Sequence, residues 1–224
     1  MKKTIIAISF LIGFLGNAAA QSAKTNLSLQ VSAAAAANRA LLKNYVWTRT
    51  VQVFISGTLK TTIVSSLSIG PDGKMVTTAV SSVATDPPPT RGIRGDIARK
   101  KIAEMKTYVD SAVKVSMSYI YMSKGKMVDY FDAAAITQSG STITVKGSNV
   151  NRTNDQFTTN LMAGSLAYTS QSFNSTSSGD AIAGTFNYKT YSNGLTAFDN
   201  GELDLPAKSM KLMISNTNYA KKLQ

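Results

Sequence analysis

Residues 45–57, YVWTRTVQVFISG, contain the most regular pattern in the chain. Polar residues such as Thr48 and Thr50 alternate there with apolar ones. The apolar side of the stretch carries Trp47, Val51, Val53 and Ile55. A period of two is the repeat of a β-strand, and a single apolar side indicates a single buried face. The sequence therefore predicts a strand that packs against a hydrophobic core.

Two further strands follow this one through short connections. Gly57 begins the first turn, and the Gly-Pro-Asp-Gly sequence at residues 70–73 forms the second. The third strand runs from Lys74 to Val83. The apolar residues of the second strand fall on one face: Leu59, Ile63, Leu67 and Ile69. Three successive strands joined by tight turns predict an antiparallel meander.

A helix is predicted on each side of this meander. Before it, residues 28–44 have an apolar stripe and an alanine run, and alanine has the highest helix propensity. After it, the prolines at 87–89 forbid helix. The second helix then begins at Asp96, a favourable N-cap, and ends near Lys124. Its apolar seam consists of Ala98, Ile102, Met105, Val109 and Ala112, widened by Val113, Met117 and Ile120.

The rest of the sequence returns to strands with looser alternation. Residues 127–135 form either a short helix or a lid-like loop, and they are too apolar to be left fully in water. Strands follow from Thr142 onward. Asn200-Gly201 predicts a hairpin turn. We favour that turn over a calcium-binding loop because the spacing of the nearby acidic residues fits no familiar ligand pattern.

The order of elements predicts an α+β fold. A curved antiparallel sheet of about eight or nine strands, open as a half-barrel, would wrap the N-terminal helix and the long central amphipathic helix. This arrangement buries both apolar helix stripes at once. Residues 21–224 are expected to form a single domain, because a chain of this size can bury one core.

Residues 1–20 predict a cleavable signal peptide. Lys2 and Lys3 precede an apolar run that ends in the small residues 18–20, and cleavage is expected between Ala20 and Gln21. A membrane anchor is the alternative, but the apolar run is shorter than the roughly 18 residues that span a bilayer. The predicted location is therefore periplasmic or secreted. Removing these residues leaves 22 basic and 12 acidic side chains, a net charge of +10.

Composition excludes several classes of chemistry. The chain has no His and no Cys, which removes Ser-His-Asp and Cys-His catalysis, thiol redox chemistry and nearly every zinc or copper site. A paired-carboxylate or Ser-Lys enzyme is the remaining catalytic alternative, but Ser209 and Lys211 have the wrong spacing for it. We therefore expect no enzyme activity, no cofactor and no metal.

Five segments resemble an uncharacterised family of secreted bacterial proteins: NYVWTRTVQV, GPDGK, PPPTRGIRG, KKIAEMKTYV and LPAKSMKLMISNTNY. The order of elements is also similar to the periplasmic lipoprotein-carrier fold, an open half-barrel lidded by helices. The resemblance implies a protein that binds a hydrophobic ligand or acyl chain and has no catalytic role.

Two kinds of site are expected. The first is a hydrophobic cavity that would hold an acyl chain, a lipid or a lipidated protein, although the same side chains could fill a dry core. Its candidate residues are Trp47, Val53, Ile63, Met105, Val109, Met117, Phe131, Phe157 and Tyr188.

The second is a basic surface that would dock on an anionic membrane or an acidic protein partner, although such charges often only solvate a helix. Its candidate residues are Arg91, Arg94, Arg99, Lys100 and Lys106. No nucleic-acid module motif is present, so nucleic acid is not an expected partner. We expect a monomer.

Overall fold

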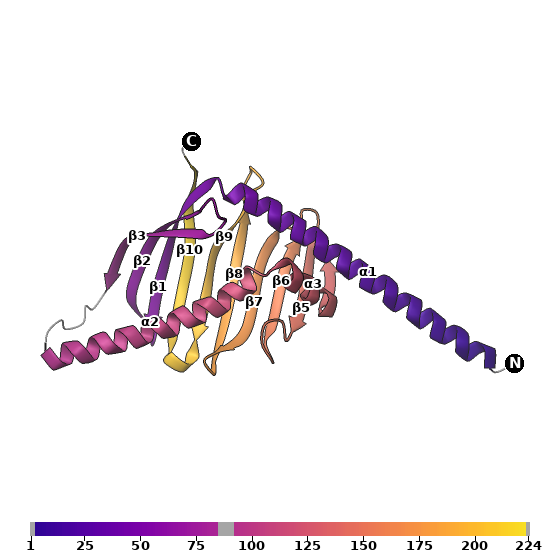
Figure 1. The fold of residues 1–224 in the computed structure, drawn as a ribbon, viewed down its shortest axis with the longest axis horizontal. Helices are drawn as coiled ribbons and strands as arrows, with labels where there is room; N and C mark the ends of the chain where they lie inside the picture. Colours follow the sequence, from indigo (N-terminus) through magenta and orange to yellow (C-terminus); the bar gives the residue numbers. More distant parts are fainter. Residues whose placement is uncertain (1–2, 85–91, 223–224) are drawn as a thin grey trace.

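The computed structural model describes residues 3–84 and 92–222, with side chains from Ala23 onward. In that part of the chain, three helices accompany ten antiparallel strands that form one open sheet. The α+β class and the curved open sheet predicted from the sequence are confirmed, with ten strands in place of about eight or nine (Figure 1). The elements are α1 (Lys3–Leu42), β1 (Tyr45–Ile55), β2 (Thr58–Ile69), β3 (Met75–Ala84), α2 (Gly92–Ile120), α3 (Lys124–Ala133), β4 (Ala135–Ser139), β5 (Thr142–Ser148), β6 (Gln156–Met162), β7 (Tyr168–Ser177), β8 (Asp180–Thr190), β9 (Thr196–Leu205), a short 3-10 turn (Pro206–Lys208) and β10 (Met210–Lys221).

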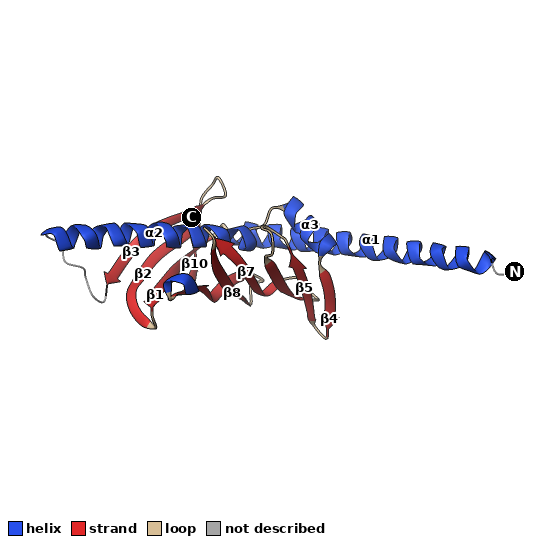
Figure 2. Cartoon of the chain, turned by 90° about the horizontal axis from the view of Figure 1, so that it is seen from below, coloured by secondary structure: helices blue, strands red, loops and turns tan. Residues whose placement is uncertain are grey.

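The sheet brings together strands from the beginning and the end of the chain. Its strand order is β3-β2-β1-β10-β9-β8-β7-β6-β5-β4, so the first and last strands are neighbours. Strands β3 and β4 form the two edges. All three helices lie on one side of this layer, which curves around them (Figures 1 and 2). The concave face therefore forms the interior of the protein.

The prediction of a hairpin turn at Asn200-Gly201 is wrong. Strand β9 runs without a break from Thr196 to Leu205, and Gly201 pairs with Ile214 and Phe186 on the two neighbouring strands. A Cβ at Gly201 would lie 2.7 Å from Cδ1 of Phe186. A strand can contain a glycine where another group comes close to its backbone. At Gly201 the aromatic ring of Phe186 lies against the backbone, which accounts for the glycine.

The apolar segment around residues 127–135 is largely helical. Helix α3 begins after Ser123, whose side-chain oxygen accepts the Lys126 backbone N–H. Met127, Tyr130 and Phe131 of this helix are buried against the sheet.

Helix α1 is joined to α3 and the residue after it by three hydrogen bonds, one of them from Nζ of Lys24 to the Asp132 carbonyl at 3.4 Å. Nζ of Lys24 donates to the carbonyl of Ala134 at 2.8 Å, and the Thr25 hydroxyl donates to Asp132 at 3.0 Å. The N-terminal and central parts of the chain are thereby joined on the concave side.

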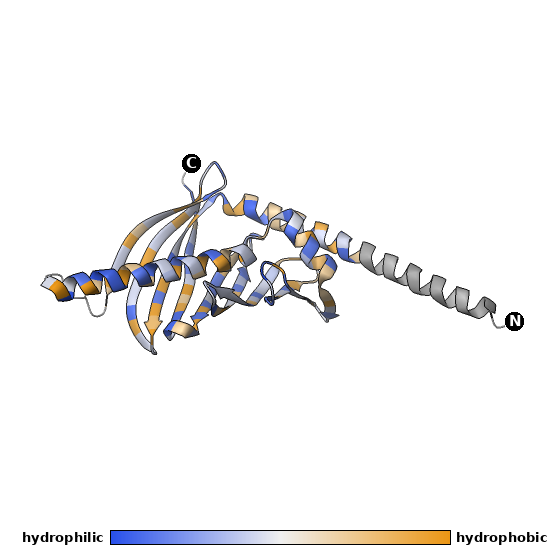
Figure 3. Ribbon diagram, turned by 60° about the horizontal axis from the view of Figure 1, so that its bottom comes forward, coloured by the Kyte–Doolittle hydropathy of each residue, from blue (hydrophilic) through white to orange (hydrophobic). Residues whose placement is uncertain are grey.

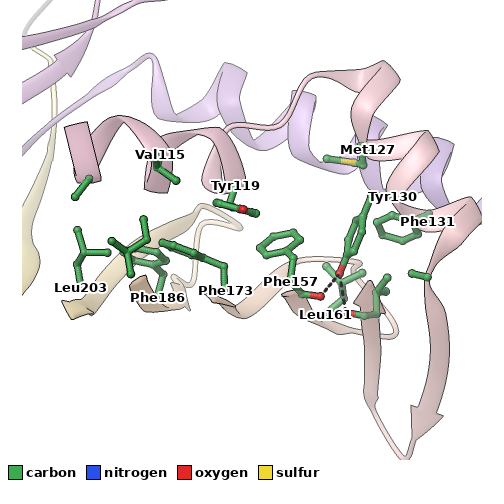
Figure 4. Packing of buried hydrophobic residues seen from close by; sticks show 14 of the residues in the cluster. Val115, Tyr119, Met127, Tyr130, Phe131, Phe157, Leu161, Phe173, Phe186 and Leu203 are labelled. Carbon is green, nitrogen blue, oxygen red and sulfur yellow. Dashed lines mark hydrogen bonds between the residues drawn. The ribbon is translucent and has the colours of Figure 1, made fainter. Parts of the chain in front are cut away.

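The core lies under the second half of α2. Figure 4 shows Val115 and Tyr119 pointing from this helix toward Phe157, Phe173 and Phe186 on the sheet. The rings of Tyr119 and Phe173 stack with centroids 4.5 Å apart. Burial of these aromatic side chains supplies most of the force that fixes α2 across the strands.

The first half of α2 is different, because its N-terminal end extends past the edge of the sheet (Figures 1 and 2). Figure 3 shows hydrophobic positions along this part of the helix. Two of its hydrophobic residues, Ile93 and Ile97, are exposed. In the described residues, no helix is long and apolar enough to cross a bilayer.

Candidate functional site: a cavity between the sheet and the helices

A cavity of about 460 Å³ lies between the concave face of the sheet and the helices. Small-molecule sites commonly have volumes of about 300–1,000 Å³, so this cavity could hold a ligand of modest size. Strands β1, β8, β9 and β10 supply much of its lining. The rest comes from helix α1, the end of α2 and the loop after it, α3, the β2–β3 hairpin and β7.

The alanine run of α1 makes room for this cavity. Ala35 and Ala36 are among its lining residues. Because a methyl group is the smallest side chain that still favours helix, the helix can cross the sheet here without filling the space beneath it. The residues that predicted the helix also leave the space under it open.

One part of the lining is apolar and adaptable. It includes three methionines, Met117, Met122 and Met127, and two aromatic residues, Tyr168 and Phe198. Methionine side chains adapt to ligands of irregular shape. Burial raises the pKa of Tyr168 to about 12, so its hydroxyl stays protonated and uncharged at neutral pH. This part suits a hydrocarbon chain.

Another part of the lining is polar and basic. Nε of Arg49 donates to Oδ1 of Asn216 at 3.0 Å, and the Tyr121 hydroxyl also lies beside the guanidinium. Arg39 lines the cavity too, and one of its terminal nitrogens donates to the Gly73 carbonyl at 2.9 Å. Among the described lining residues there is no Asp or Glu.

Trp47 lies in the same polar part of the lining, and its indole N–H is an unsatisfied hydrogen-bond donor. Its side chain is only 3 % exposed, and its ring stacks on Tyr219 with centroids 5.6 Å apart. The indole Nε1 is buried and has no hydrogen-bond partner among the described residues. A buried donor of this kind costs free energy until an acceptor reaches it.

The nine residues predicted for a hydrophobic site divide into three groups. Trp47, Met117 and Tyr188 line the cavity. Val53, Met105, Val109, Phe131 and Phe157 pack into the core or against it, as the dry-core alternative proposed. Ile63 lies on β2 and is 37 % exposed. Sequence periodicity identified the inward faces but could not tell which inward positions the helices cover tightly.

The five residues predicted for a basic surface are not equivalent. Arg99 forms an ion pair with Asp96, and Lys106 forms one with Asp110, so part of their charge is compensated on the same helix. Arg94 and Lys100 are exposed on the projecting half of α2. Arg91 lies outside the described residues.

Sequence analysis missed Arg49, Asn216 and Tyr219 as cavity residues. The signal for Arg49 was present in the alternation of β1, where it occupies an inward position between Trp47 and Val51. A charged residue in the inward register of a strand is unusual, because that face is normally apolar.

Comparisons with known proteins add little to this geometry. No family model matches the chain, and no curated protein is similar to it. Among solved structures, the crystal structure of a DUF1329 family protein from Desulfovibrio piger is similar at 8 % sequence identity, with a TM-score of 0.41. That similarity covers 90 % of this chain and 93 % of the other.

Proposed function

We propose that this protein is a non-catalytic envelope protein that binds a hydrophobic ligand in the cavity between its sheet and its helices. The ligand would be a lipid, a free acyl chain or the acyl group of a lipidated protein. A signal peptide at residues 1–20 would direct the chain to the periplasm or out of the cell.

The observation that carries this proposal is the apolar cavity under α1. Its methionines and aromatic side chains border the aromatic core beneath α2, and two of them, Met127 and Phe186, belong to both the cavity wall and the core. A dry core of this size would normally be filled, because protein interiors pack with few voids larger than a water molecule. At about 30 Å³ for each liquid water, the volume is that of roughly fifteen water molecules, which suits a single acyl chain better than several chains.

The substitution Ala35→Trp tests the proposal, because an indole at this position would occupy the cavity. We expect it to weaken binding of the neutral apolar dye N-phenyl-1-naphthylamine at least about tenfold, a loss of ~1.4 kcal/mol. Dye fluorescence during titration measures the affinity.

The matched control is Ala33→Trp, since Ala33 is exposed on the same helix and does not line the cavity. This control is expected to bind the dye like the unchanged protein. Equal dye binding by both variants, or no saturable binding by the unchanged protein, would argue against the proposed function.

A second candidate function is docking on an anionic membrane through the first half of α2. Ile93 is 80 % exposed and Ile97 is 52 % exposed, and the helix places them one turn apart on the same side. Lys100 and Lys101 follow within the next turn and are also exposed. Apolar side chains bordered by lysines are typical of helices that lie at the surface of acidic membranes.

Co-sedimentation with phosphatidylglycerol vesicles tests this second candidate. Each basic residue near an anionic surface contributes about 1 kcal/mol, so Lys100→Gln is expected to weaken binding roughly fivefold. The control Lys146→Gln removes an exposed charge from β5 and should leave binding unchanged. Binding that is insensitive to salt, or equal for both variants, would exclude membrane docking by α2.

A further inference from the structure

We propose that the cavity selects a single-chain amphiphile with an anionic end, whose carboxylate or phosphate binds the guanidinium of Arg49. This inference rests on the proposed function, because it specifies the ligand of the same cavity.

Arg49 occupies the centre of a polar row on the concave face. It pairs with Asn216 on β10 and with Ser65 on β2, so three polar side chains follow one another across three strands. The neighbouring rows of the same face are apolar and contain Trp47 beside Leu67, and Val51 beside Ile63. A guanidinium is thus held in one place on an otherwise apolar surface.

This guanidinium has donors left to bind an anion. Of the five N–H donors of an arginine, Nε–H is bound by Asn216, and the hydroxyls of Tyr121 and Tyr219 are the other polar groups that act on the guanidinium. No ion pair to Arg49 is formed by the described residues. A partly buried charge without a counter-ion is unfavourable, and a carboxylate or phosphate can accept two of its hydrogen bonds in parallel.

Two neighbours strengthen the preference for an anion. Arg39 lines the same cavity as Arg49, and the charges of both arginines act on Tyr121. Trp47 stands two residues before Arg49 on the same face of β1, and its buried Nε1–H has no acceptor among the described residues. An anionic group at this position would lie in a cavity that the guanidinium groups of Arg39 and Arg49 both line.

The rest of the cavity fits the remainder of such a molecule. From the polar row the lining continues to Met117, Met127 and Phe198, which present no charge. A ligand with an anionic end and one hydrocarbon chain would therefore match both parts. A neutral ligand would leave Arg49 buried and uncompensated.

Competition against bound N-phenyl-1-naphthylamine tests this inference. Hexadecanoate, hexadecyl phosphate and hexadecanol share one chain length and differ only in the end group. We expect one or both anions to displace the dye at concentrations at least about tenfold lower than the alcohol, a difference of ~1.4 kcal/mol. The order of the two anions tells whether a carboxylate or a phosphate is preferred.

The variant Arg49→Met should abolish this preference when each displacement is compared with the variant's own dye affinity, and Arg49→Lys should retain part of it. Lys146→Met, which removes an exposed charge elsewhere, should behave like the unchanged protein. Circular dichroism checks that each variant is folded. The preference of the unchanged protein for an anionic end group over the alcohol tests the inference even without the variants.

The outcomes separate the two proposals. If hexadecanol displaces the dye as well as both anions do, or if Arg49→Met weakens all three equally, the anionic-ligand inference is overturned and hydrophobic binding stands. If neither the dye nor any of the three binds, both proposals fail.

Discussion

Gly201→Ala is expected to lower the free energy of unfolding by about 3 kcal/mol, at the upper end of what overpacking usually costs. A Cβ at this position would lie 2.5 Å from the Thr185 carbonyl oxygen and 2.7 Å from the Phe186 ring. The first of these atoms is backbone of the neighbouring strand, which cannot move without disturbing the β8–β9 pairing. The ring of Phe186 lines the cavity, so the substitution should also weaken dye binding.

Urea unfolding measures this loss as a lower midpoint with an unchanged slope. Gly164→Ala is the matched control, because a Cβ there would meet nothing within 4 Å. The control should change stability by no more than about 0.5 kcal/mol. If the two variants unfold at the same urea concentration, Phe186 does not lie against the backbone of β9 as described.

Asp155→Ala is expected to lower the free energy of unfolding by about 3 kcal/mol, because it removes the acceptor of a charged hydrogen-bond cluster. The carboxylate of Asp155 is buried and accepts the hydroxyl of Tyr119 at 2.5 Å. It also accepts the backbone N–H groups of Val150, Asn151 and Arg152 at 2.6 to 2.8 Å. Without it, the loop before β6 loses its support, and α2 keeps only the hydrogen bond from the Asn151 side-chain amide to the Ser118 carbonyl among the described polar connections to that loop.

The effect of Asp155→Ala should depend on pH. Burial raises the pKa of Asp155, but the hydrogen bonds from Tyr119 and the three N–H groups outweigh burial and leave the pKa below its ordinary value of 3.8. A carboxyl whose folded pKa is lowered contributes its full stability above the unfolded pKa and loses it as the pH falls through the folded pKa.

The stability difference between Asp155→Ala and the unchanged protein should therefore be constant near neutral pH and shrink below about pH 3.8. Urea unfolding at a series of pH values measures it. Asp129→Ala, which removes an exposed carboxyl from α3, is the control and should change stability by no more than about 0.5 kcal/mol. A constant difference down to the acid limit would mean that the Asp155 carboxylate is not stabilised by these donors.

Most of the fold could be predicted from local patterns. The alternation in β1, the Gly-Pro-Asp-Gly turn and the apolar seam of α2 depend only on residues close in sequence, and they gave the correct elements and class. The errors came from contacts distant in sequence. Asn200-Gly201 has the chemistry of a turn, and only the close approach of the Thr185 carbonyl and the Phe186 ring on the neighbouring strand explains why a glycine lies within β9.

The site was predictable in part for the same reason. Trp47, Met117 and Tyr188 are inward residues of predicted elements, and they line the cavity. Phe131 and Phe157 are buried in the core instead, where Phe131, itself on α3, packs against Tyr130, and Phe157 packs against Tyr119 of α2. Where a helix crosses a sheet is set by tertiary packing, so periodicity could not distinguish a wall of the cavity from the core.

The fluorescence of Trp47 tests the central claim most directly. It is the single tryptophan of the chain, it lines the cavity and it is only 3 % exposed, so it reports on this site alone. Hexadecanoates brominated at either end of the chain quench tryptophan only on contact. If the cavity holds the ligand, at least one isomer will quench Trp47 saturably, and the isomer brominated beside the carboxylate should quench it most if Arg49 binds that end. Displacement of the dye by both isomers while Trp47 emission stays unchanged would place the bound chain elsewhere and contradict the account.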